Sequence, residues 1–142
     1  MRRRDFLGVL GGAVAAWPVV ARAQQAAMPV VVFLNSGTAA TSPSGMAFRD
    51  GLKDTGFVDG QNVKIEYRFA EGQYERLGVI IAEATARQVP VLAATGGVHT
   101  ALAAKPASNT IPVVFANGSD PVQYGLVARL HPPWANLTGV RF

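Results

Sequence analysis

Three short polar turns hold the side chains of this sequence that are best suited to binding chemistry. They read Asn35-Ser36-Gly37-Thr38, Thr95-Gly96-Gly97 and Asn117-Gly118-Ser119-Asp120, and each follows an apolar run. Backbone N–H groups at such turns suit a carboxylate or another anion. Asp120 offers the opposite charge, which suits an ammonium group, so the turns together could hold an amino acid. The same residue types also cap helices in any protein, and capping is the competing interpretation. The candidate ligand-binding residues are Asn35, Ser36, Gly37, Thr95, Gly96, Gly97, Asn117, Ser119 and Asp120.

The sequence lacks the motifs of the common catalytic and cofactor sites. It contains no phosphate-binding Gly-x-x-x-x-Gly-Lys-Ser/Thr loop, no Gly-x-Gly-x-x-Gly after a strand, no Gly-x-Ser-x-Gly elbow and no cysteine. Of the two histidines, His99 falls at a predicted helix start and His131 beside two prolines, and we interpret both as surface residues. Metal-ligating residues do not cluster. We therefore predict no catalytic residue, no metal and no cofactor.

Apolar runs predict the strands that must position the three turns. The unbroken run Pro29–Leu34 predicts a strand buried on both faces, which we take as the centre of the sheet. Val89–Ala94 and Ile111–Ala116 predict further buried strands. Val63–Phe69 alternates apolar and charged residues, which indicates a half-exposed edge strand. A last strand begins at Leu137.

Four helices are predicted between these strands. The first runs over 43–54 with Ser42 as its N-cap, Gly56 as its stop and Ala47, Phe48 and Leu52 buried. The others cover 74–87, 98–105 and, more weakly, 122–130; the apolar stripe of the second is Tyr74, Leu77, Ile80, Ile81 and Ala84. Alternating strands and helices predict an α/β fold, a doubly wound parallel sheet with right-handed crossovers. The carboxyl ends of its strands share one edge, so the three turns should meet there.

The first 23 residues have the order of an export signal. Arg3-Arg4-Asp5-Phe6-Leu7 matches the twin-arginine pattern, a moderately apolar stretch follows, and Ala21-Arg22-Ala23 offers a cleavage site. We expect cleavage after Ala23 and a periplasmic protein; an uncleaved membrane anchor is the alternative. This segment carries most of the net charge of +4, and without it 9 basic and 8 acidic side chains remain. No basic face is left to predict binding to nucleic acid.

Several short stretches along residues 48–140 resemble one family. Phe48-Arg49-Asp50-Gly51-Leu52, Gly60-Gln61-Asn62-Val63, Asp120-Pro121-Val122 and Asn136-Leu137-Thr138-Gly139-Val140 are similar to the ABC-transporter substrate-binding proteins whose members take aromatic amino acids. The resemblance implies a type I periplasmic-binding fold, in which two α/β lobes close over a small-molecule ligand and dock to an ABC permease. It implies no catalysis, and it implies contact with the membrane only through the permease.

The sequence departs from that family in length and at a few positions. Family members are about twice as long, so we expect residues 24–142 to form the N-terminal lobe, with the second lobe absent. The usual Pro-Gly-Gly-Asn turn reads Pro133-Trp134-Ala135-Asn136, and Pro106 interrupts the third helix. The leading interpretation is a truncated solute-binding component of an ABC importer. The alternative is a small exported flavodoxin-like enzyme or a freestanding interaction module.

Overall fold

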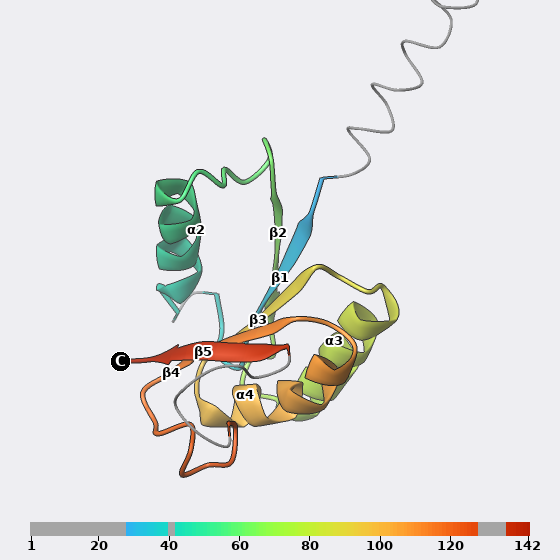
Figure 1. Cartoon of the computed structure of the whole chain (residues 1–142), viewed down its shortest axis with the longest axis vertical. Helices are drawn as coiled ribbons and strands as arrows, with labels where there is room; N and C mark the ends of the chain where they lie inside the picture. The colour runs from blue at the N-terminus through green and yellow to red at the C-terminus, as the bar shows by residue number, and fades with distance from the viewer. Residues whose placement is uncertain (1–27, 40–41, 128–135) are drawn as a thin grey trace, which may run out of the picture.

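Five parallel strands form one sheet in the computed structural model, which describes residues 28–39, 42–127 and 136–142. The strands are β1 (Val30–Asn35), β2 (Lys64–Phe69), β3 (Val91–Thr95), β4 (Val113–Asn117) and β5 (Leu137–Arg141). They lie in the order β2-β1-β3-β4-β5 (Figure 1). The sheet confirms the predicted α/β class. The expectation that the run after Pro29 is the central strand is wrong, because β3 occupies the middle and β1 lies between β2 and β3.

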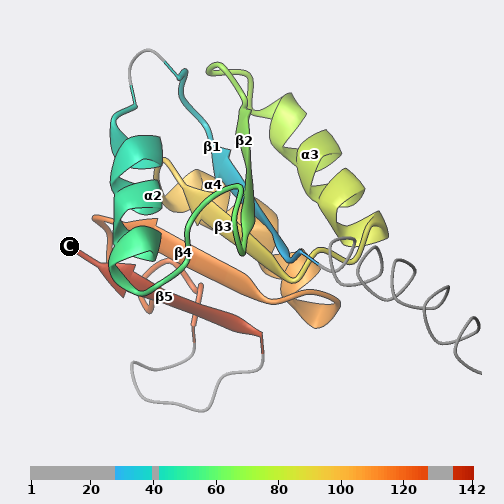
Figure 2. The same cartoon turned by 90° about the horizontal axis from the view of Figure 1, so that it is seen from above.

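Helices cover both faces of the sheet. Helix α2 (Ser44–Asp54) lies on one face, and α3 (Glu75–Ala86) and α4 (Val98–Ala104) lie on the other (Figures 1 and 2). A short 3₁₀ helix, η1 (Lys105–Asn109), continues α4 where Pro106 interrupts it. Across the sheet, the connection from β1 to β2 runs in one direction, and the connections from β2 to β3 and from β3 to β4 run in the other. Right-handed crossovers therefore place α2 opposite α3 and α4.

The hydrophobic core divides into two clusters, one on each side of the sheet. The larger lies under α3 and α4 and contains Leu34, Leu77, Ile80, Leu92 and Phe115 among its buried side chains. The smaller lies under α2 and consists of Val31, Phe33, Val63, Ile65 and Ala93, with Phe48, Leu52, Phe69 and Val91 packed half-buried against it. The core is therefore larger on the side of α3 and α4 than on the side of α2.

The predicted helix faces hold with two corrections. In α3, Leu77, Ile80, Ile81 and Ala84 are buried as predicted. Tyr74 is exposed instead, because it is the N-cap and its side chain falls outside the apolar stripe. In α2, Phe48 and Leu52 are half-buried, but Ala47 is exposed because only one edge of this helix contacts the sheet.

The beginning of α2 also differs from the prediction. Its N-cap is Pro43, and no side chain caps the helix. The Ser42 hydroxyl instead accepts a hydrogen bond from Asn35 Nδ2 and lies in contact with the Ser44 hydroxyl. At the other end the helix stops before Gly56, whose φ of +93° is the predicted left-handed conformation.

Strand β2 is the predicted edge strand, and two bidentate ion pairs tie it to α3. Arg87 donates to both oxygens of Glu66 at 2.8 and 2.9 Å, and Arg68 donates to both oxygens of Glu83 at 3.1 and 2.9 Å. The hydrogen bond from Arg87 lowers the pKa of Glu66 despite an opposing desolvation effect. Charged side chains of this kind protect an edge strand from pairing with other chains.

The fourth predicted helix, 122–130, is wrong as far as the structure describes it. Residues 121–126 form turns, in which Gly125 has a φ of +71° and Leu126 N–H donates to the Pro121 carbonyl. A left-handed residue at this point ends any helix before it is one turn long. Residues 128–130 lie outside the described part, as do the signal segment 1–23, His131 and the 133–135 turn. Within the described ranges no helix is long and apolar enough to cross a membrane.

Candidate ligand-binding site

The three polar turns meet at the carboxyl edge of the sheet, as their positions after parallel strands predicted. They surround one open cavity of about 380 Å³. Its lining residues are Asn35, Ser36, Gly37, Ser42, Ser44, Gly96, Gly97, Ala116, Asn117, Gly118 and Phe142. Six of the nine candidate binding residues are therefore brought together around a single space.

Asn35 closes the first turn with a full set of hydrogen bonds. Its Oδ1 accepts from Gly37 N–H at 2.8 Å, which fixes the turn. Its Nδ2 lies within 3.0 Å of Thr95 Oγ1 and 3.2 Å of the hydroxyls of Ser42 and Ser44. The side chain is buried, and Thr95 in turn donates to the Leu34 carbonyl. Asn35 thus joins β1, β3 and the start of α2.

Ser36 and Gly96 hold the first and second turns against each other. The Ser36 hydroxyl donates to the Gly96 carbonyl at 2.7 Å. Gly96 has a φ of +89°, and a Cβ added there would lie 2.8 Å from both the nitrogen and the hydroxyl oxygen of Ser36. Both the backbone conformation and the close approach require glycine at this position.

Asn117 forms the same kind of turn at the end of β4 but leaves its amide unsatisfied. Its Oδ1 accepts from Ser119 N–H at 2.9 Å, as Asn35 Oδ1 accepts from Gly37. The residue is only 1% exposed, and its Nδ2 has no hydrogen-bond partner. A buried N–H donor without a partner costs about 1–3 kcal/mol, so such groups are rare and call for an explanation.

A second buried polar atom without a partner, Thr100 Oγ1, lies in α4 and does not line the cavity. Asn117 does line it. Among the described residues, Asn117 is therefore the one that both lines this cavity and carries a buried side-chain donor without a partner.

The remaining three candidate residues lie outside the cavity lining. Thr95 is buried behind Asn35 and supports it. Ser119 contributes its N–H to the Asn117 turn. Asp120 Oδ1 accepts from the N–H of Val122 at 2.8 Å, and its Oδ2 lies 3.6 Å from Arg141. The Asp120 carboxylate thus caps a turn and faces a cation of the chain itself.

Five lining residues were not among the sequence-based candidates. Ser42 and Ser44 lie at the start of α2, which returns to the same edge after the first turn. Ala116 and Gly118 flank Asn117. Phe142 follows β5, and its ring comes within 3.8 Å of a Cβ placed at Gly118. The parallel arrangement of β4 and β5 could have indicated Phe142, because β5 ends at the same edge.

The residues that line this edge supply hydrogen-bonding groups. The described residues contain no group of three histidine, cysteine, aspartate or glutamate side chains placed to hold a metal ion. His99 is exposed at the start of α4, where it meets Tyr74 edge-on with ring centroids 5.8 Å apart. The cavity combines amide, hydroxyl and backbone groups with the apolar side chains of Ala116 and Phe142.

The family of this chain follows from a match that covers most of it. Residues 27–141 match the family described as ABC transporter substrate binding protein. The chain belongs to this family. A tyrosine-binding protein from Clostridioides difficile strain R20291 is 30% identical over 92 residues, which are 65% of this chain and 26% of that protein.

Three solved structures share the fold described above. A conserved domain protein from Vibrio cholerae is 30% identical with a TM-score of 0.70, and the match covers 80% of this chain and 38% of that one. A ligand-free, open substrate-binding protein with adhesive properties from Clostridium difficile is 25% identical with a TM-score of 0.69 and the same coverage. A protein from Streptococcus pneumonia in complex with L-Trp is 23% identical with a TM-score of 0.65, and the match covers 79% of this chain and 37% of that one. The chain thus spans about two fifths of the length of these solved structures.

Proposed function

We propose that this chain forms one wall of a ligand cleft that binds a small molecule such as an amino acid, as the solute-binding component of an ABC importer. It carries out no catalysis in this role. The observation that carries the proposal is Asn117, which lines the cavity formed by all three polar turns and whose buried amide donor has no partner. A ligand oxygen accepting from Nδ2 would satisfy it.

Two named relatives support an amino acid as the ligand. One is called a tyrosine-binding protein, and another was solved in complex with L-Trp. An α-carboxylate supplies the acceptor that Asn117 requires, and a hydrogen bond to a charged group is worth about 1.5–3 kcal/mol. The rings and methyl groups of Phe142 and Ala116 provide an apolar wall for a side chain.

Asp120 remains our proposed partner for the ligand ammonium group, but at the border of the site. Its Oδ2 faces Arg141 at 3.6 Å, and both side chains are partly exposed. A ligand ammonium would have to compete with this arginine. We therefore rank Asp120 below Asn117 as a determinant of affinity.

We further propose that the protein acts in the periplasm and docks to an ABC permease. Arg3-Arg4 and the cleavage site after Ala23 support export by the twin-arginine route. Changing both arginines to lysine should leave full-length precursor in the cytoplasm, measured by fractionation and N-terminal sequencing. Mature protein beginning near Gln24 in the periplasm of this double variant would contradict the proposed route.

The binding proposal is best tested in a protein with a complete cleft. The chain is joined at Phe142 to the part of the Vibrio cholerae relative that follows its matched segment, and L-tyrosine and L-tryptophan are titrated by calorimetry. Asn117→Ser keeps an oxygen for the Ser119 N–H and removes the amide donor, and the serine hydroxyl is one bond too short to take the place of Nδ2. It should weaken binding roughly tenfold to a hundredfold, as loss of one charge-assisted hydrogen bond predicts.

The matched control is Asn109→Ser, which makes the same change at an exposed position of η1, before β4 begins. It should leave the affinity unchanged. Equal affinities for the Asn117→Ser variant and the unsubstituted chimera would remove Asn117 from the site. A folded chimera that binds neither amino acid would contradict the proposed ligand class.

A further inference from the structure

Two serines at the start of α2 carry hydroxyl groups that the helix itself does not use. Ser42 and Ser44 flank Pro43, and a serine at a helix start ordinarily caps the helix by accepting from a backbone N–H. Here Pro43 is the N-cap and no side chain caps α2. Both serines are half-buried and line the cavity at the carboxyl edge of the sheet. Helix capping therefore does not account for their hydroxyls.

The Asn35 amide has only one proton to give to this pair of serines. Asn35 Nδ2 carries two protons, and one goes to Thr95 Oγ1 at 3.0 Å. Thr95 donates its own proton to the Leu34 carbonyl at 3.1 Å, so towards Asn35 it is an acceptor. The second amide proton is left for Ser42 and Ser44, whose hydroxyl oxygens both lie 3.2 Å from Nδ2.

The two serine hydroxyls together carry one proton more than their neighbours accept. The Ser42 and Ser44 hydroxyls contact each other, so one of them can donate to the other. The proton of the second hydroxyl then has no acceptor among the described residues. Because both serines line the cavity, this proton is available to an acceptor bound there.

The other polar side chains around this cavity also leave donors rather than acceptors. The side-chain oxygens of Asn35 and Asn117 each accept from a backbone N–H of their own turn. The Ser36 hydroxyl proton is already donated to the Gly96 carbonyl. The Asn117 amide has no partner, and none of the described lining residues is acidic. A ligand group made of acceptors, such as a carboxylate, complements this set.

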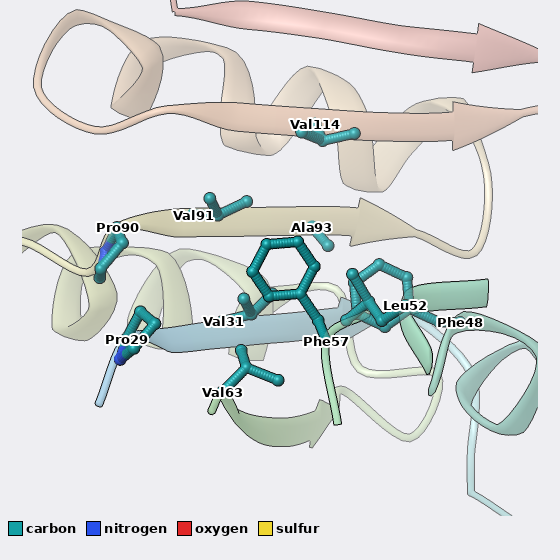
Figure 3. A pocket seen from close by; sticks show the side chains of 10 residues that line it. All are labelled: Pro29, Val31, Phe48, Leu52, Phe57, Val63, Pro90, Val91, Ala93 and Val114. Carbon is teal, nitrogen blue, oxygen red and sulfur yellow. The ribbon is translucent and has the colours of Figure 1, made fainter. Parts of the chain in front are cut away.

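Another cavity, of about 360 Å³, offers no such groups. It lies on the α2 side of β1 and β3, and Figure 3 shows Phe57 lying across these strands with Phe48 and Leu52 at one end. Its lining consists only of proline, valine, leucine, phenylalanine and alanine residues, so none of its side chains can donate a hydrogen bond. A carboxylate therefore favours the cavity that Ser42 and Ser44 line.

We propose that Ser42 and Ser44 together donate one hydrogen bond to the carboxylate of the ligand, and that either hydroxyl alone is sufficient. When one serine is removed, the other still accepts the Asn35 amide proton, and its own proton is no longer shared with a neighbour. The equal distances from Nδ2 make the two oxygens interchangeable towards the amide. This inference rests on the proposed binding of an amino acid in this cavity.

The test is a calorimetric titration of the Vibrio cholerae chimera described above with L-tryptophan. Ser42→Ala and Ser44→Ala should each weaken binding by less than about threefold, because one donor remains in each variant. The double variant should weaken binding roughly tenfold to a hundredfold, because it loses one charge-assisted hydrogen bond. The matched control is Ser108→Ala in η1, which removes a hydroxyl that donates to the Lys105 carbonyl outside the cavity lining and should leave the affinity unchanged.

A second double variant keeps the test decisive if loss of both oxygens impairs folding, which circular dichroism would show. Ser42→Ala combined with Ser44→Cys retains an acceptor for the Asn35 amide, but its thiol is a weak donor, so the loss of affinity should be similar. Single losses that add up to the loss in the double variant would overturn the proposal, as would a folded double variant that binds as tightly as the chimera. A folded chimera that does not bind the amino acid would instead contradict the proposed function, and this inference with it.

Discussion

Asn35 and Asn117 occupy equivalent places in the fold and have opposite surroundings. Each ends a buried parallel strand, and each accepts with Oδ1 from the N–H two residues later. They are 3% and 1% exposed. The Asn35 amide has three oxygen atoms within 3.2 Å, whereas the Asn117 amide has none.

This difference separates a residue that stabilises the fold from one that we propose as a ligand-binding residue. The oxygens around Asn35 come from β3 and from the start of α2, so its amide is used to join elements of the sheet. Asn117 instead lines the cavity, and its amide has no partner. An identical local motif therefore predicts a turn at both positions but does not by itself predict which amide is left without a partner.

The largest difference between the two turns is expected from glycine substitutions beside them. Gly96→Ala, next to the Asn35 turn, combines a left-handed backbone with a Cβ 2.8 Å from Ser36 N and should cost about 2–4 kcal/mol of unfolding free energy. Gly118→Ala, in the Asn117 turn, meets nothing closer than Phe142 at 3.8 Å and should change it by at most about 0.5 kcal/mol. Urea denaturation measures both, and similar losses would contradict the comparison.

Substitution of the asparagines themselves should give a smaller difference in stability. Asn35→Ser removes the amide that joins Thr95 to the α2 serines and should cost about 2–3 kcal/mol. Asn117→Ser removes a donor that has no partner, so its cost should stay within about 1 kcal/mol. Urea denaturation of the two variants tests this. Equal costs would mean that the Asn117 amide is satisfied in solution.

The difference in unfolding free energy between Asn35→Ser and Asn117→Ser should not depend on pH, although the unfolding free energy of the protein should. The pKa of Glu66 is lowered first by its hydrogen bond from Arg87, so its folded value lies below the ordinary 4.5. The contribution of Glu66 to the unfolding free energy is fully present above the pKa that Glu66 has in the unfolded chain. It is lost as the pH falls through the pKa that Glu66 has in the folded protein. Unfolding free energies measured from pH 7 down to pH 3 should therefore fall in acid.

Arg87→Gln should reduce this acid sensitivity, because it removes the main cause of the shift. The difference between Asn35→Ser and Asn117→Ser should stay constant over the same range, since neither amide titrates. If the two variants became equally stable in acid, a titrating group, and not the neutral amide, would distinguish the two turns.

The smallest effect is expected from free amino acids on the melting temperature of the 142-residue chain. One wall of a cleft leaves a ligand partly solvated, so its affinity should be orders of magnitude below that of a closed cleft. With a dissociation constant of about 10 mM, about 1 mM ligand stabilises by only about 0.06 kcal/mol, which is well under 1 °C. A rise of several degrees in differential scanning fluorimetry would show that this wall binds alone.

The sequence predicted the parts of this structure that depend on local pattern. The buried runs became β1, β3 and β4, the alternating run became the edge strand β2, and the turn residues met at one edge. It failed where neighbours decide the outcome. Ser42 is used by Asn35 and not as a helix cap, and Gly125 interrupts the weak helical pattern after Asp120. No periodicity could have shown that Asn35 is satisfied and Asn117 is not, because the partners of Asn35 come from a neighbouring strand 60 residues away and from a chain segment that folds back at Ser42 and Ser44.

Titration of the ¹⁵N-labelled chain with L-tryptophan, followed on the side-chain amide signals of Asn35 and Asn117, tests the central claim most directly. Asn109, an exposed asparagine of η1, serves as the internal reference. At millimolar ligand the Asn117 amide should shift progressively, while those of Asn35 and Asn109 stay fixed, because a weakly bound carboxylate exchanges rapidly at the unsatisfied donor. An unmoved Asn117 signal at the highest soluble ligand concentration, or equal shifts at all three asparagines, would contradict the assignment of this cavity as the ligand site.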